Sequence, residues 1–148
     1  MRIRDKIKKP QRPVVAYEIL PPREKDGTLN TYAETISSLL SQTHIDAINI
    51  PEVHDEIGRG ERPVSNQERG EPRKFGMLLQ DIVGIEAIIN RVVVHMPMKK
   101  QMEWIQETHS KYEIDNLIIV GGESSKQQYP GPTVNESLKR ISEANRHL

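Results

Sequence analysis

The 148-residue chain has no cysteine, which excludes disulfide bridges, thiolate metal sites and cysteine nucleophiles. Lys and Arg together number 21, as do Asp and Glu, so no net charge attracts nucleic acid or an anionic membrane. No apolar run approaches the roughly 20 residues that a membrane-spanning helix needs. Residues 1–9 also lack the apolar segment of a secretory signal. The sequence therefore predicts a cytoplasmic protein without nucleic-acid or membrane partners.

The length suits a single domain, although only 35% of the residues are hydrophobic, which predicts an incomplete core. Residues 1–12 are basic and precede a proline. We expect them to form a flexible, loosely held arm in front of a single domain at residues 13–148. An RNA-binding tail is the alternative, but the arm has no aromatic residue that could stack on bases.

Four times along the chain, an apolar run ends at a polar residue and is followed by a segment with helical spacing. The strands predicted from these runs are residues 14–20, 45–50, 86–94 and 116–120. Strands that alternate with helices form a parallel α/β sheet, which binds ligands at the carboxyl ends of its strands. The polar residues at these ends are therefore predicted to share one rim: Glu18, Asn49, His95 and Glu123.

The segments between the strands predict helices and one long charged loop. Apolar spacing predicts helices at about residues 29–42, 75–82 and 98–112, and a last one from Val134. Met98, Met102, Ile105 and Tyr112 share a helix face that we expect in the core, and Trp104 lies off that face. Residues 51–73 show no apolar period, which is typical of a functional lid or a mobile loop.

Glu18 is the most distinctive candidate catalytic residue. It lies between apolar neighbours in the first strand, where a carboxyl group is partly desolvated and its protonated form is favoured. A carboxylic acid that keeps its proton near neutral pH is suited to general acid catalysis. Alternatively, the alternation of the strand directs Glu18 to solvent or to a partner such as Arg91.

Two glycines precede Glu123 at the end of the last strand. Gly121 and Gly122 would let the backbone approach a ligand, and Glu123 could accept hydrogen bonds from ring N–H groups or a ribose hydroxyl. An ordinary turn is the alternative, and the glycine spacing is not that of a dinucleotide fingerprint. Ser124 and Ser125 have no His–Asp pair at a recognisable spacing, which argues against a serine nucleophile.

His95 could orient or stack on a planar ligand, although a purely structural histidine is the alternative. Four residues of the long loop resemble a metal cluster in their types: Glu52, His54, Asp55 and Glu56. They lack a second fixed ligand group, so we expect a solvated loop and no metal site.

Three segments, in order, resemble motifs of the methylenetetrahydrofolate reductase family. Tyr17-Glu-Ile-Leu-Pro-Pro22 resembles the family's Phe-Glu-Phe-Phe-Pro-Pro, and Val94-His-Met-Pro97 resembles Ala-His-Leu-Thr. Asn116-Leu-Ile-Ile-Val-Gly-Gly-Glu123 resembles Asn-Ile-Leu-Ala-Leu-Arg-Gly-Asp. The chain departs from the family at Ile48-Asn-Ile-Pro51, where Val-Thr-Tyr-Gly is usual, and at Gly121, where the family has arginine.

The resemblance implies a (β/α)8 TIM barrel, of which the four β–α units are the N-terminal half. It implies an oxidoreductase of folate one-carbon metabolism that moves a hydride from NAD(P)H to a flavin, FAD or FMN, and then to a folate-type substrate. Glu18 matches the glutamate that protonates the folate nitrogen, and Glu123 takes the place of an aspartate between flavin and pterin. The expected cofactor-binding residues are Asn49, His95, Gly121, Gly122 and Glu123.

Half a barrel would leave a flavin ring exposed to water, so we expect self-association or a partner chain to complete the sheet. Two other functions stay open. One is a non-catalytic truncated relative that acts as a pterin- or protein-binding module. The other is a fragment of a folate-binding, methyltransferase-like barrel that needs no flavin.

Overall fold

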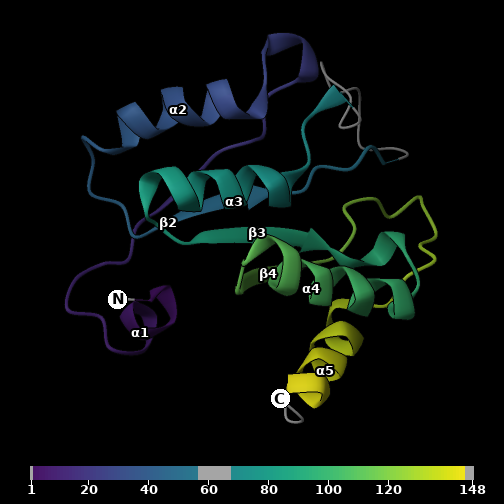
Figure 1. Cartoon of the computed structure of the whole chain (residues 1–148). Helices are drawn as coiled ribbons and strands as arrows, with labels where there is room; N and C mark the ends of the chain where they lie inside the picture. The colour runs from purple at the N-terminus through teal and green to yellow at the C-terminus, as the bar shows by residue number, and fades with distance from the viewer. Residues whose placement is uncertain (1, 57–67, 146–148) are drawn as a thin grey trace.

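The computed structural model describes residues 2–56 and 68–145, so residues 57–67 of the predicted long loop lie outside the described residues. It contains one sheet of four parallel strands in the order β1-β2-β3-β4 (Figure 1). The strands are β1 (Ala16–Glu18), β2 (Ala47–Pro51), β3 (Ala87–Val92) and β4 (Asn116–Val120). The predicted α/β class with four consecutive β–α units is therefore confirmed.

Helices alternate with these strands along the chain. They are α1 (Ile3–Lys8), α2 (Leu29–Leu40), α3 (Pro72–Val83), α4 (Met98–Tyr112) and α5 (Val134–Asn145), with short 3-10 turns η1 (Glu24–Asp26) and η3 (Val93–His95). The helix ends follow local chemistry: the Thr28 hydroxyl accepts from the first turn of α2, and Gly84 ends α3 in the left-handed region. No helix in the described part of the chain is long and apolar enough to cross a membrane.

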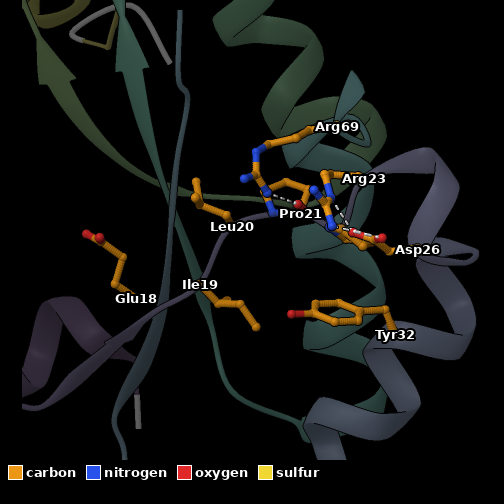
Figure 2. A pocket seen from close by; sticks show the side chains of 9 residues that line it. Glu18, Ile19, Leu20, Pro21, Arg23, Asp26, Tyr32 and Arg69 are labelled. Atoms are coloured by element: carbon orange, nitrogen blue, oxygen red, sulfur yellow. Dashed lines mark hydrogen bonds and ion pairs between the residues drawn. The ribbon is translucent and has the colours of Figure 1, made fainter. Parts of the chain in front are cut away.

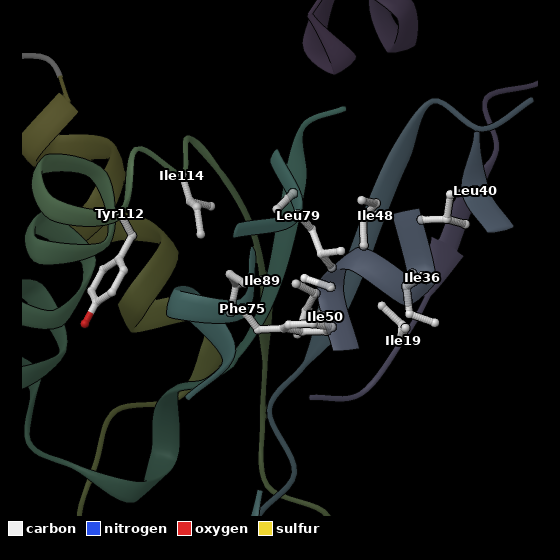
Figure 3. Close-up of a cluster of buried hydrophobic side chains, with 12 residues drawn as sticks. Ile19, Ile36, Leu40, Ile48, Ile50, Phe75, Leu79, Ile89, Tyr112 and Ile114 are labelled. Carbon is white, nitrogen blue, oxygen red and sulfur yellow. The ribbon is translucent and has the colours of Figure 1, made fainter. Parts of the chain in front are cut away.

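One face of the sheet packs against the helices and forms the core. Ile48 and Ile50 of β2 pair in register with Ala87 and Ile89 of β3, and all four side chains are fully buried. Phe75 of α3 inserts between these strands and α2 (Figure 3). Because side chains alternate along a strand, the residues between these core positions lie on the opposite face.

That opposite face is called the open face below. By register it carries Glu18, Asn49, Ile88, Asn90, Ile118 and Val120. Ile118 is 45% exposed and Val120 is 36% exposed, although both are apolar strand residues. Parallel sheets normally have both faces covered, so this half-covered sheet presents a surface suited to a further element or ligand.

The N-terminal segment is folded against the domain rather than loosely held. Ile3 of α1 is buried, and Lys6 and Arg12 both pair with the Asp46 carboxylate at distances of 2.9 and 2.7 Å. A hydrogen bond from the Val15 N–H, with those from Arg12 and Lys6, holds the pKa of Asp46 well below its usual range. This arrangement differs from the arm that the sequence predicts, because the basic residues act as partners of one buried carboxylate.

Of the α4 face predicted to lie in the core, only Tyr112 is buried. Gln101, Thr108 and Tyr112 are buried, whereas Met98, Met102 and Ile105 are only half-buried. The sequence does not show whether Trp104 is exposed or packed; in the structure it packs against the core. Gln101 is buried with both ends of its amide satisfied: Oε1 accepts from Arg91 of β3, and Nε2 donates to the Val93 carbonyl.

Candidate functional site

Glu18 and Asn49 lie side by side at the carboxyl ends of β1 and β2. They are register partners, and the Asn49 amide Nδ2 donates a 3.0 Å hydrogen bond to Glu18 Oε2. All residues of β1 are exposed, so the desolvation that the sequence predicts for Glu18 is wrong for this structure. Arg91, its suggested partner, lies on the other face and pairs elsewhere. The Asn49 amide is therefore the group that orients the carboxylate.

The open face also carries two buried acceptors without partners. In the described residues, Asn49 Oδ1 and Asn90 Oδ1 are shielded from solvent and accept no hydrogen bond. A buried polar atom left unpaired costs free energy, so such atoms often mark a place where a ligand or partner supplies the missing group. Both atoms would suit N–H donors of a planar heterocycle placed on this face.

Arg91 forms the polar centre of the opposite, helix-covered face. Its guanidinium donates to Glu52 Oε1 at 2.7 Å and to Gln101 Oε1 at 2.9 Å, and it stacks on Trp104 with 4.1 Å between Cζ and the ring centroid. Glu52 Oε2 accepts from the Val92 N–H at 3.0 Å. Burial alone would raise the pKa of Glu52, but His54, Arg91 and the Val92 N–H together hold it below its ordinary value.

Glu56 is the hydrogen-bonding centre of a second cluster at the carboxyl ends of β2, β3 and β4. Its side chain is 2% exposed, and Oε1 lies 2.9 Å from His95 Nε2. Glu56 Oε2 accepts from the Glu123 N–H at 2.7 Å and from the Tyr129 hydroxyl at 2.9 Å. His54 stacks on His95 with 4.2 Å between ring centroids. These five residues are called the rim cluster.

The solvated loop predicted for residues 52–56 is therefore wrong for both glutamates. Glu52 and Glu56 are held inside by an arginine of β3 and by groups of three different segments. Within residues 2–56 and 68–145, no group of His, Asp and Glu side chains has a geometry that could hold a metal ion. The polar groups of the rim cluster instead form hydrogen bonds with one another, and this network holds the loop after β2 in place.

The titratable groups of the rim cluster are shifted by their surroundings. Burial and the neighbouring His54 lower the pKa of His95, and the hydrogen bond to Glu56 only partly opposes them. Burial and the Glu56 carboxylate raise the pKa of Tyr129. His95 is thus a neutral imidazole near neutral pH, suited to a polar but uncharged contact at the rim.

Of the two glycines after β4, Gly121 and Gly122, one is required by close packing within the chain. A Cβ at Gly122 would collide with the ring of Tyr129, whereas a Cβ at Gly121 would make an ordinary 3.5 Å contact with Val134. The Glu123 side chain is exposed, and its backbone N–H is the group that joins the rim cluster. The close approach predicted for the two glycines is therefore made at Gly122 by Tyr129 of the same chain.

The structure groups the predicted rim residues into two sets. Glu18 and Asn49 meet on the open face, and His95 meets the backbone of Glu123 through Glu56. Sequence reasoning missed Tyr129, whose one signal is its place in a glycine- and proline-containing loop.

No protein-family model matches the chain, and a search of curated proteins finds no match either.

Proposed function

We propose that this chain supplies half of a flavin-dependent oxidoreductase barrel resembling methylenetetrahydrofolate reductase. Its reaction would be hydride transfer from NAD(P)H through FAD or FMN to a folate-type substrate, once further strands complete the sheet. The observation that carries the proposal is the open face, where an oriented carboxylate, unpaired acceptors and exposed apolar residues lie together on a parallel sheet. Parallel α/β folds bind their ligands at such strand ends.

The residues of the open face fit a flavin or pterin ring. Ile118 and Val120 offer exposed apolar surface on β4 for a planar ring. Asn49 Oδ1 and Asn90 Oδ1 lack partners among the described residues and could accept from ring N–H groups. A flavin bound here would supply the hydride relay, while the protein residues bind the ring and exclude water from one side.

Glu18 would act as the acid in this reaction. Its carboxyl group, oriented by the Asn49 amide, would donate a proton to a substrate nitrogen as the hydride arrives. Glu18 is exposed in this structure, so a partner that covers the open face would have to desolvate its carboxyl group.

The two edge strands of the sheet, β1 and β4, also favour pairing with a further chain. In the described residues, β1 pairs only with β2 and β4 only with β3, which leaves one unpaired edge on each. A second copy or a partner chain that continues the sheet from both edges would close it and remove the exposed backbone groups.

A second function is favoured by the exposure of Glu18. With Glu18 in this exposed position, the chain would be a non-catalytic module that binds a pterin or another protein on the same face. This module and the flavoenzyme make different predictions for the same purified protein.

The test is a visible absorption spectrum after incubation with FAD or FMN and removal of free flavin. We expect retained flavin in the wild type, loss of flavin in Ile118→Glu on the open face, and retention in the control Leu39→Glu. Leu39 is an exposed apolar residue of α2, away from this face. Glu18→Gln should keep the flavin and its reduction by NADH but lose turnover with methylenetetrahydrofolate.

A colourless wild-type protein would refute the flavin-dependent function. Folate binding by that colourless protein, measured by calorimetry, would support the pterin-binding module or the methyltransferase-like alternative. Equal flavin loss in Ile118→Glu and Leu39→Glu would show that flavin does not bind on the open face.

A further inference from the structure

A separate cleft of about 500 Å³ lies where β1 ends and the chain turns toward α2. It is lined by residues 18–22 together with Arg23, Asp26, Tyr32 and Arg69 (Figure 2). Its volume falls within the range of small-molecule sites, about 300–1,000 Å³. Glu18 lines this cleft and also belongs to the open face, but Figure 2 shows its carboxylate pointing away from the two arginines.

The two arginines of this cleft are held next to each other by the backbone. Arg23 and Arg69 form an isolated antiparallel bridge, and the Gly70 N–H donates to the Pro22 carbonyl at 3.0 Å. Side chains directly opposite in such a pair are close, and like charges in these positions repel. An arrangement that brings two guanidinium groups together is stabilised by an anion between them.

Each guanidinium is fixed on one side and has donors left on the other. Arg23 donates through Nε and Nη2 to the Asp26 carboxylate. Arg69 donates through Nη1 to the Pro21 carbonyl at 2.9 Å. Four groups have no hydrogen-bond partner among the described residues: Arg69 Nε, Arg69 Nη2, Arg23 Nη1 and the Tyr32 hydroxyl.

The side chains of Arg23, Arg69 and Asp26 together carry one positive charge; the Glu18 carboxylate also lines the cleft but points away from both arginines (Figure 2). Asp26 is the one described carboxylate that contacts either guanidinium, and its hydrogen bond raises the pKa of Arg23. One further negative charge would therefore neutralise the pair.

We propose that this cleft binds an oxyanion, carried as a carboxylate or a phosphate group on a small molecule. Arg69 contacts the oxyanion through Nε and Nη2, a fork whose spacing matches two oxygens of one group. Arg23 Nη1 and the Tyr32 hydroxyl donate from the other sides. The Tyr32 ring is positioned for this by Phe75, with 5.9 Å between ring centroids. The site is independent of the flavin-dependent function, because Arg69, Arg23 and Tyr32, which contact the oxyanion, do not belong to the open face.

The experiment is an NMR titration of the arginine Nε–H signals at constant ionic strength. Inorganic phosphate and glutarate are the two probes, with sodium chloride as the background salt, so the arms separate a phosphate source from a carboxylate source. We expect saturable shifts of the Arg69 signal with at least one probe at concentrations up to about 10 mM. Arg69→Gln should weaken that binding about tenfold or more, because a charge-assisted bidentate contact is lost.

Lys139→Gln is the matched control, since it removes one positive charge from an exposed position on α5. It should bind the probe as the wild type does. If Arg69→Gln fails to fold, Arg23→Gln replaces it, with the same expected weakening. The proposal is overturned if neither probe gives saturable shifts, or if Lys139→Gln weakens binding as much as the arginine variants do.

Discussion

The buried Arg91–Glu52 pair gives the sharpest prediction about stability. Their side chains are 3% and 10% exposed, so removal of Arg91 leaves the Glu52 carboxylate buried without its charged partner. Breaking such a pair costs about 3–5 kcal/mol, and Arg91→Met would also lose the stacking on Trp104, worth about 1 kcal/mol. The longer apolar side chain of methionine returns some packing. We expect Arg91→Met to lower the free energy of unfolding by about 3 kcal/mol.

The double variant Arg91→Met with Glu52→Gln should recover much of this loss. With neither charge present, the site loses mainly hydrogen bonds, and buried pairs replaced on both sides are often close to neutral. We therefore expect the double variant to lie nearer the wild type than Arg91→Met does. The difference from additivity measures the coupling between the two residues.

Urea unfolding followed by tryptophan fluorescence suits this cycle, because Trp104 is the chain's one tryptophan and contacts Arg91 directly. Circular dichroism of the same samples checks that the fluorescence follows global unfolding. Arg140→Met is the control, since that exposed arginine pairs with Glu143 on the surface and should change stability by less than about 0.5 kcal/mol. An Arg91→Met variant as stable as the control, or single effects that simply add, would refute the reasoning.

Three further predictions concern the core and the rim cluster. Phe75→Ala empties a fully buried site and should cost about 3–5 kcal/mol in urea unfolding; a loss under 1 kcal/mol would show that α3 is not packed as described. Gly122→Ala should lower the melting temperature because its methyl group meets Tyr129, whereas Gly121→Ala should leave it nearly unchanged; equal effects would contradict the contact. Burial lowers the pKa of His95 below its unfolded value of 6.5, so the unfolded state takes up a proton on this histidine more readily than the folded state. The stability that His95 contributes is therefore complete above pH 6.5 and is lost as the pH falls through the lower pKa of the folded state. His95→Gln should therefore show a flatter decline in urea midpoint between about pH 7 and 5 than the wild type, and parallel declines would count against the shift.

Much of the fold was predictable because its determinants are local. The strand at Asn116–Val120 and the end of α3 at Gly84 follow from a continuous apolar run and from a residue suited to the left-handed region. The predicted strand at residues 14–20 is longer than β1, and the one at 86–94 runs past β3 into η3. Apolar content alone does not reveal where hydrogen bonding to a neighbouring strand stops.

The site was predictable only where it depends on strand ends. Glu18 and Asn49 meet because parallel neighbours end at the same edge, and the sequence shows both ends. Glu56 and Tyr129 are 73 residues apart, and no periodic pattern connects them. The burial of Glu52 likewise depends on a distant arginine, which turns a charged loop residue into an interior one. Such long-range polar pairing leaves no local signal in the sequence.

The docking of α1 has a consequence for how the protein assembles during synthesis. Helix α1 precedes all four strands in the chain, yet its partners are the side chains of Asp46, Glu86 and Asp115, reached by Lys6, by the Ile3 N–H and by Arg2. Each strand, by contrast, pairs with the strand made just before it. The sheet can therefore grow in the order of translation, while the α1 segment meets its last partner, Asp115, only after β3 and α4 have been made.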